Sequence, residues 1–123
     1  MNEECSAVVI DLAMEFMELM PKVEPTWKKA FYRFCSDEFQ HGSNGSYVYQ
    51  SGVRLIDPFK HASSLHSMNA KAVKLLDLLK EGQGVFLLVV DLDFQYDLKF
   101  EFTDLGRWRI TKLNGGNGIP DGL

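Results

Sequence analysis

The chain contains little cysteine and no long apolar run. Only two cysteines, Cys5 and Cys35, occur among its 123 residues, and they form no CxxC pair. This usage favours reduced thiols in a cytosolic protein, although the sequence leaves open a disulfide between the two. No apolar run approaches the ~20 residues that a membrane-spanning helix needs. The first 20 residues carry five acidic side chains and no basic one, so they lack the positive start of a secretory signal.

The chain also has no excess of basic residues. Its 17 acidic and 13 basic side chains give a formal net charge of −4, which phosphate backbones and anionic membranes repel. Direct binding to nucleic acid is therefore disfavoured. The length of 123 residues and the 46% hydrophobic content are typical of one globular domain. We expect that domain to span residues 1–113, followed by a flexible glycine-rich tail over residues 114–123.

Two segments have the apolar periodicity of amphipathic helices. The first runs from about Glu3 to Met20, and Pro21 is expected to end it. The second has an apolar stripe from Met68 to Leu79. Ser67 is expected as its N-cap and Gly82 as its left-handed C-terminal residue.

The remaining segments favour β-structure, and the Asn44-Gly45 and Ser51-Gly52 pairs are expected to form tight turns between strands. Because the strands come in consecutive runs, the sequence predicts an α+β fold. The predicted fold has one antiparallel sheet of about five or six strands. Two helices pack on one face of this sheet, and the opposite face is expected to be open, polar and acidic. The expected strands are residues 26–36, 46–50, 53–57, 85–93, 95–103 and 107–113.

The last strands carry most of the negative charge. Residues 81–104 contain six acidic side chains and one lysine, a local net charge of −5. Residues 95–103 also alternate, which places the aromatic side chains in the core and the charged ones outside. The inward set is Tyr96, Leu98, Phe100 and Phe102, and the outward set is Asp97, Lys99, Glu101 and Thr103.

A catalytic role for this acidic segment, residues 81–104, would require a bound metal ion. Asp91 and Asp93 form a DxD whose carboxylates would lie ~7 Å apart on one strand face, an arrangement that can bind Mg²⁺. A small divalent-metal enzyme is thus one alternative. No P-loop, HExxH or glycine-rich nucleotide turn accompanies the pair, and His41, His61 and His66 fit no zinc spacing. We therefore expect no enzyme, no catalytic residue, no cofactor and no metal.

A second interpretation is a docking surface, since a concentrated acidic patch attracts a cationic partner. A plain solvated face explains the charge equally well. Aromatic side chains beside the charge are typical of interface anchors. The candidate binding residues are Asp91, Asp93, Phe94, Asp97, Glu101, Asp104, Tyr47 and Tyr49.

Two motifs resemble a known family. One is the pattern W-x-x-A-x-x-R-F at residues 27–34, and the other is L-x-V-D-x-D-x-x-Y-x-x-x-F-E-[FY]-x-D-x-x-x-W at residues 88–108. Together they resemble the YezG-like immunity proteins of bacterial polymorphic toxin and contact-dependent growth inhibition systems. The specific residues are Leu88, Val90, Asp91, Asp93, Tyr96, Phe100, Glu101, Phe102, Asp104 and Trp108.

The resemblance implies a small cytoplasmic protein that binds a cognate toxin C-terminal domain, commonly a basic nuclease, and neutralises it by stoichiometric masking. It also implies that Tyr96, Phe100, Phe102 and Trp108 belong to the core. An adaptor domain for a partner unrelated to toxins is the remaining alternative. The identity of the toxin, the contact surface and the oligomeric state of the free protein stay open.

Overall fold

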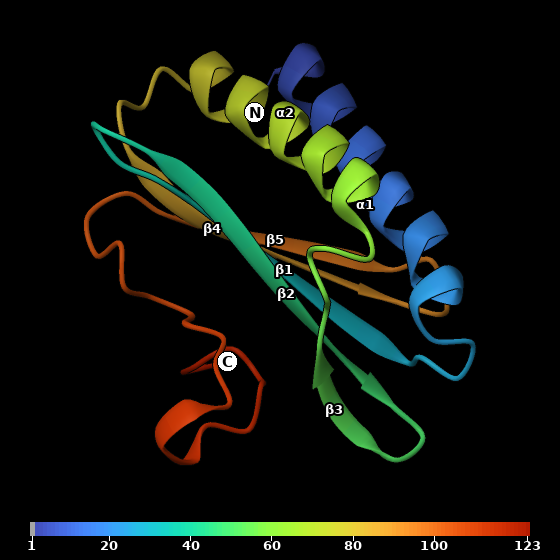
Figure 1. Ribbon diagram of the computed structural model, residues 1–123. Coiled ribbons are helices and arrows are strands. Elements are labelled where there is room, and N and C mark those ends of the chain that lie inside the picture. Colours follow the sequence, from blue (N-terminus) through green and yellow to red (C-terminus); the bar gives the residue numbers. More distant parts are fainter. Residues whose placement is uncertain (1) are drawn as a thin grey trace.

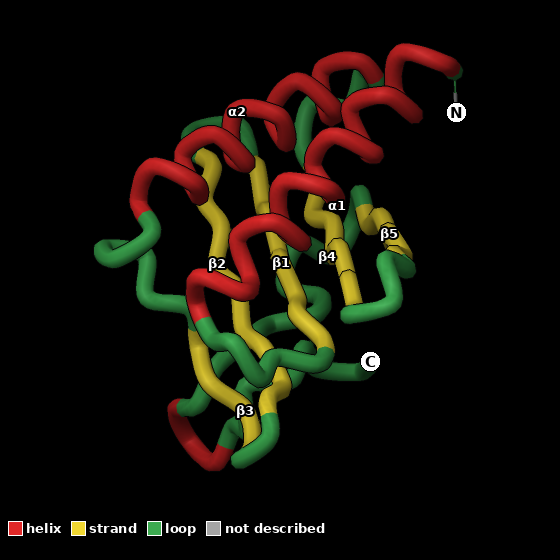
Figure 2. Tube along the Cα trace, turned by 90° about the vertical axis from the view of Figure 1, so that its right-hand side faces the viewer, coloured by secondary structure: helices red, strands yellow, loops and turns green. Residues whose placement is uncertain are grey.

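The fold is one antiparallel sheet with two helices on one face, as predicted. The computed structural model describes residues 2–123. The strand order is β3-β2-β1-β4-β5, and both helices cover the same side of the sheet (Figures 1 and 2). The elements are α1 (Glu3–Val23), β1 (Lys29–Ser36), β2 (His41–Tyr49), β3 (Gly52–Leu55), α2 (Ala62–Leu78), β4 (Gly84–Asp91), β5 (Tyr96–Glu101) and a 3₁₀ turn (Leu113–Gly115).

Helix α1 begins as expected but ends later. The Asn2 side chain caps it by accepting a hydrogen bond from the Cys5 N–H over 2.8 Å. Pro21 lies inside the last turn, so the prediction that it ends the helix is wrong. The Glu24 N–H still donates to the Met20 carbonyl over 2.9 Å, which closes the turn that contains the proline.

Both predicted caps of α2 are wrong. The helix begins at Ala62, which places Ser67 inside it. At its other end Lys80, not Gly82, adopts the left-handed conformation, with φ 59°. The Lys80 N–H donates to the Asp77 carbonyl and the Glu81 N–H to the Leu76 carbonyl. This pair of bonds is a Schellman motif with lysine at the usual glycine position.

The Asn44-Gly45 pair does not form a turn. It lies within β2, where Asn44 pairs with Arg33 and Gly45 with Tyr32. A Cβ at Gly45 would lie 2.8 Å from the Phe31 carbonyl oxygen, so this position needs glycine for close packing rather than for a turn. The β1–β2 turn is instead residues 37–40, where the Asp37 N–H donates to the Gln40 carbonyl over 2.9 Å.

The main core lies between the sheet and the helices. Phe16 of α1, Tyr32 of β1 and Phe86 of β4 are fully buried there. Leu98, Phe100 and Phe102 pack against this core, as the alternation of residues 95–103 predicts. Tyr96, at the start of β5, is 46% exposed and is the exception.

The opposite face of the sheet is not open. The segment after β5 crosses it, as Figure 1 shows below the sheet, and residues 107–113 do not form the predicted sixth strand. Trp108 and Ile110 of this segment are 3% and 4% exposed, and they form a second core on the sheet. The sheet side chains of this core are Phe31, Val85 and Leu87.

Polar side chains of the sheet bind this crossing segment. Arg33 donates to the carbonyls of Leu105 and Arg107 over 2.6 and 2.8 Å. Further along, the buried Ser46 hydroxyl donates to the Gly118 carbonyl over 2.6 Å. Gly118 and Pro120 are themselves buried, so the glycine-rich segment expected as a loose tail lies against the sheet.

Candidate functional site

Asp91 shapes the turn between β4 and β5. Its Oδ1 accepts hydrogen bonds from the backbone N–H groups of Asp93 and Gln95 over 2.8 and 3.2 Å. The Asp91 N–H donates to the Gln95 carbonyl over 3.1 Å. One carboxylate oxygen of the sequence-predicted site is therefore committed to building the turn.

The predicted DxD arrangement does not form on one strand. Asp91 is the last residue of β4, and Asp93 follows it in the turn. The alternation that would place both carboxylates on one face ends before the second one. Within residues 2–123, no group of three or more His, Cys, Asp or Glu side chains is arranged to hold a metal ion.

Phe94 lies at the tip of this turn, and its side chain is mostly exposed. Its φ of 59° is in the left-handed region, which a bulky side chain rarely adopts. Its side chain is 74% exposed, and Leu92, two residues earlier, is 51% exposed. The turn therefore presents two apolar side chains around the exposed Asp93, as expected for Phe94 from the sequence.

Glu101 and Asp104 lie at the other end of β5 and shape a second loop. Glu101 accepts hydrogen bonds from the Thr103 and Asp104 N–H groups and from the Arg107 guanidinium, the last over 2.9 Å. The Thr103 N–H, followed by Arg107, holds the pKa of the Glu101 carboxyl below its usual range. Asp104 in turn accepts from the Gly106 N–H over 3.0 Å.

The acidic residues therefore form two groups rather than one patch. Five residue steps along β5 separate Tyr96 from Glu101, a distance of roughly 17 Å by the strand rise. Asp91 and Asp93 lie near one end, while Glu101 and Asp104 lie at the other. Asp97 lies one residue from the turn end, is exposed, and has Lys99 3.8 Å away.

Tyr47 and Tyr49 are not part of this surface. Both point toward the helices from β2, with ring centroids 5.7 Å apart, and Tyr47 is only 5% exposed. Tyr49 is half-buried, and the Arg54 guanidinium lies 4.8 Å from its ring centroid. Tyr47 is therefore not an exposed anchor, because the helix-facing side of β2 belongs to the main core, and Tyr49 packs against that core while remaining partly exposed.

A groove between α1 and the β4–β5 turn was not predicted from the sequence. It has a volume of about 350 Å³, and its lining is mainly apolar. Met14 of α1 is 47% exposed at this groove. The signal was present in the sequence, because Ile10 and Met14 add apolar side chains to α1 beyond the stripe that the core needs, and both are exposed. The lining residues are Met14, Met17, Glu18, Pro21, Trp27, Asp91, Leu92 and Phe94.

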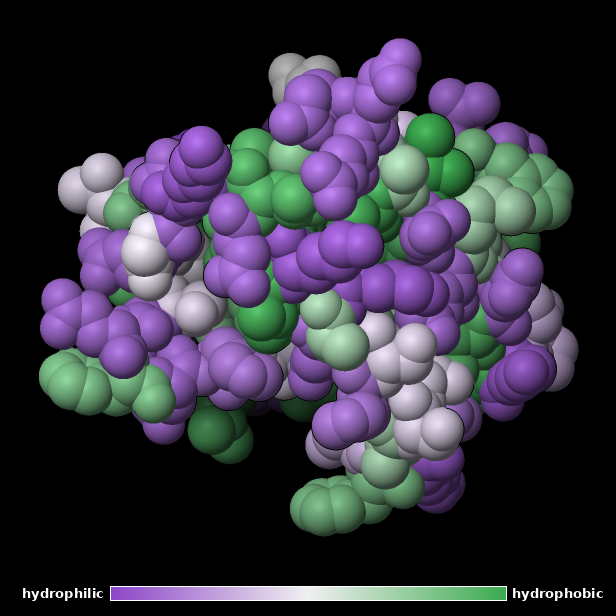
Figure 3. Space-filling view, turned by 90° about the horizontal axis from the view of Figure 1, so that it is seen from above, coloured by the Kyte–Doolittle hydropathy of each residue, from purple (hydrophilic) through white to green (hydrophobic). Residues whose placement is uncertain are grey.

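The helix side of the molecule is otherwise mostly polar. In Figure 3, which views the molecule from above, hydrophilic side chains cover most of the surface, with hydrophobic side chains exposed in separate areas between them. This side also carries negative charge at the groove, because Glu18 of α1 is exposed there. Exposed apolar side chains ringed by charge are typical of protein-binding sites.

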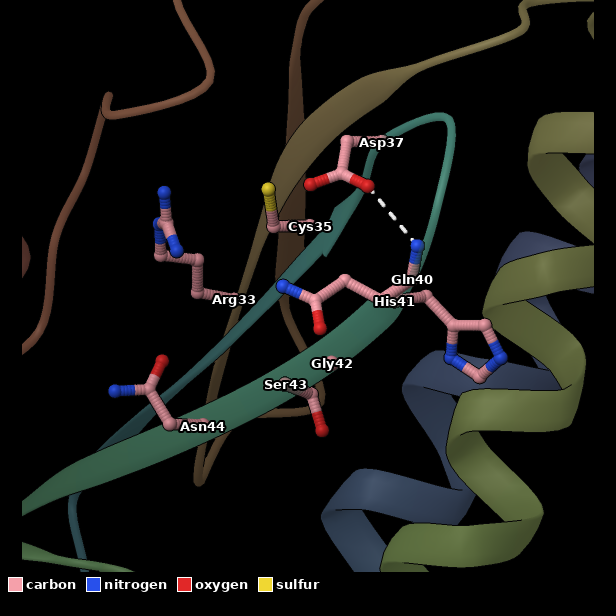
Figure 4. A pocket seen from close by; sticks show the side chains of 8 residues that line it. All are labelled: Arg33, Cys35, Asp37, Gln40, His41, Gly42, Ser43 and Asn44. Atoms are coloured by element: carbon pink, nitrogen blue, oxygen red, sulfur yellow. Dashed lines mark hydrogen bonds between the residues drawn. The ribbon is translucent and has the colours of Figure 1, made fainter.

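A polar cavity of about 430 Å³ lies at the end of β1 and β2. Figure 4 shows Cys35 and Arg33 on one side of these strands and His41 directed toward the helices. His41 packs on the Phe34 ring of the main core, so it cannot act as the base for the Cys35 thiol. Asp37 accepts hydrogen bonds from the Phe39 and Gln40 N–H groups, which lower the pKa of its carboxyl.

The cysteines and histidines do not assemble into a reactive site in the described chain. Cys5 and Cys35 are free thiols, one buried in α1 and the other on the far face of β1. His41 and His66 line a groove between β2 and α2 with Asn69, and His61 precedes α2. The Asn69 Oδ1 accepts hydrogen bonds from the hydroxyls of Tyr32 and Ser43, so this amide is already used by the core.

Comparison with known proteins identifies no family for this chain. No protein-family model matches it, and no curated protein does so. The resemblance to YezG-like immunity proteins stays a hypothesis that rests on the motif residues. Neither helix in residues 2–123 combines the length and the apolar character needed to cross a bilayer.

Proposed function

We propose that this chain is an immunity protein that binds a cognate bacterial toxin domain in the cytoplasm and neutralises it by stoichiometric masking. The observation that supports this proposal best is the β4–β5 turn, where the 74% exposed Phe94 follows the exposed Asp93. An exposed aromatic ring supplies contact area, and the Asp93 carboxylate, which has no ion-pair partner within residues 2–123, attracts a cationic partner.

The proposed partner is a toxin domain with a basic cleft, such as a nuclease. A nuclease needs lysine and arginine to hold its phosphate substrate. The exposed Asp93 carboxylate of the turn carries the opposite charge, so the turn would be drawn to that cleft and would compete with the substrate. Glu101 and Asp104 contribute less to the proposal, because their carboxylates already accept local hydrogen bonds.

The test is co-expression. Growth of cells that produce the toxin domain encoded next to this chain is scored with and without this protein, and the pair is then purified. The proposal expects rescue of growth and a one-to-one complex. Toxicity that this protein does not relieve would contradict it and would favour an adaptor role for the same surface.

A further inference from the structure

The groove between α1 and the β4–β5 turn, here called the α1–turn groove, is not filled by any of residues 2–123. Its floor includes Met17 and the 5% exposed Trp27, and its walls are Met14 on one side and Leu92 with Phe94 on the other. The two walls come from elements that are far apart in the sequence but that pack together, since α1 contacts β4. Water covers this apolar surface in the free protein, at a free-energy cost proportional to its area.

The chain's own C-terminus does not fill the groove. Leu123 lies at a different cavity, which Lys29, Asp97 and Lys99 line. A second copy of the chain is also a poor occupant. In a two-fold dimer the same patch meets itself, and the acidic rim of one copy would face the acidic rim of the other.

The charged side chains at the edge of the groove indicate which charge the occupant should carry. Glu18 lines the groove on α1, and Asp93 lies between Leu92 and Phe94 on the turn. Neither carboxylate forms an ion pair within the described residues, whereas Glu15, Asp97 and Glu101 each do. The unpaired Glu18 carboxylate on one wall of this apolar groove, with the exposed Asp93 on the adjoining turn, suits a basic residue beside an apolar one.

We propose that the α1–turn groove receives one long aliphatic or aromatic side chain of the toxin domain, flanked by a lysine or arginine that meets Glu18 at the groove. This inference rests on the proposed function and names the contact through which it operates. The volume of about 350 Å³ is near the lower end of the range for binding pockets, ~300–1,000 Å³. It suits a single anchor side chain better than a whole helix.

The test measures binding of the purified toxin domain by titration calorimetry. Phe94→Asn removes the ring and keeps a residue that tolerates the left-handed conformation, and Met14→Gln removes apolar surface from the other wall while it preserves helix propensity. Each variant is expected to weaken the Kd on the order of 10- to 100-fold, as anchor residues do. Thermal unfolding of each variant checks that the fold is intact.

Phe39→Ser is the matched control, because Phe39 is 91% exposed and lies on the β1–β2 turn, outside the groove. Its Kd is expected to stay within about twofold of the wild-type value. The double variant Glu18→Gln/Asp93→Asn is expected to slow association and to flatten its dependence on salt.

The outcomes separate the two proposals. If wild-type protein rescues growth and binds the toxin domain, but Phe94→Asn and Met14→Gln bind equally well, the groove proposal is wrong and the proposed function stands. If wild-type protein neither rescues nor binds, the proposed function fails and this inference fails with it.

Discussion

The Arg107 guanidinium donates to Oε1 of Glu101 over 2.9 Å, and this pair closes the loop that leads from β5 to the second core. Glu101 also accepts from two backbone N–H groups, beginning with that of Thr103. These contacts favour the ionised carboxylate and so lower its pKa in the folded protein. Their stabilising effect is therefore present above the unfolded-state pKa of ~4.3 and is lost as the pH falls through the lower folded-state value.

Glu101→Gln tests this relationship through its pH dependence. The variant should be less stable than wild type at pH 7, and the difference in unfolding free energy should shrink as the pH falls below about 4. Urea unfolding at a series of pH values measures it. A difference that stays constant from pH 7 to pH 3 would show that the charge of Glu101 does not stabilise the loop.

Trp108→Ala should destabilise the fold by about 3 kcal/mol or more, as truncation of large buried aromatic residues does. Trp108 is 3% exposed and packs in the second core with Phe31 and Leu87. Leu113→Ala, at a side chain that is 76% exposed, is the control and should change stability by less than about 0.5 kcal/mol. Equal effects of the two substitutions would mean that the segment after β5 is only loosely held.

Ser46→Ala should cost about 1–3 kcal/mol, because it leaves the Gly118 carbonyl without its partner in a buried position. Removal of residues 114–123 should destabilise the protein further, since it also exposes the sheet surface beneath them. Chemical denaturation of both proteins measures the effects. Full wild-type stability of the truncated chain would restore the prediction of a flexible tail.

Lys80→Gly should stabilise the protein by about 1 kcal/mol, because glycine adopts the left-handed conformation without the steric cost that lysine incurs. Lys74→Gly is the matched control: Lys74 is exposed in the middle of α2, where glycine should instead destabilise by ~1 kcal/mol. Thermal unfolding distinguishes the two. Destabilisation by both substitutions would contradict the Schellman geometry at the end of α2.

Periodic patterns in the sequence predicted the parts of the fold that depend on burial of a regular element. The alternation of residues 95–103 identified the helix-facing side of β5, and the apolar stripes identified both helices. Predictions failed where a residue pattern typical of one local structure had a different structural role. Gly45 is glycine because the Phe31 carbonyl and Ile56 approach it closely, which only the tertiary structure reveals.

Burial of Trp108 was expected from the family resemblance and is confirmed, but a second core on this face was not predicted, because its segment lacks regular structure. Trp108, Ile110 and Ile119 cover the sheet through side chains spaced irregularly along a coil, so no period identifies them. The same cover overturned the expectation of an open acidic face. Local negative charge was likewise a poor guide to the site, since Asp91, Glu101 and Asp104 use their carboxylates to cap loops.

The central claim is direct neutralisation of a basic toxin domain, and a titration of its activity tests that claim most directly. Nuclease activity of the purified domain is measured against increasing amounts of this protein and of the variant Glu18→Lys/Asp93→Lys/Asp97→Lys, which spares the loop-capping carboxylates. We predict that activity falls to zero at one equivalent of wild-type protein and persists well beyond one equivalent of the variant. Full activity in the presence of excess wild-type protein would contradict the account.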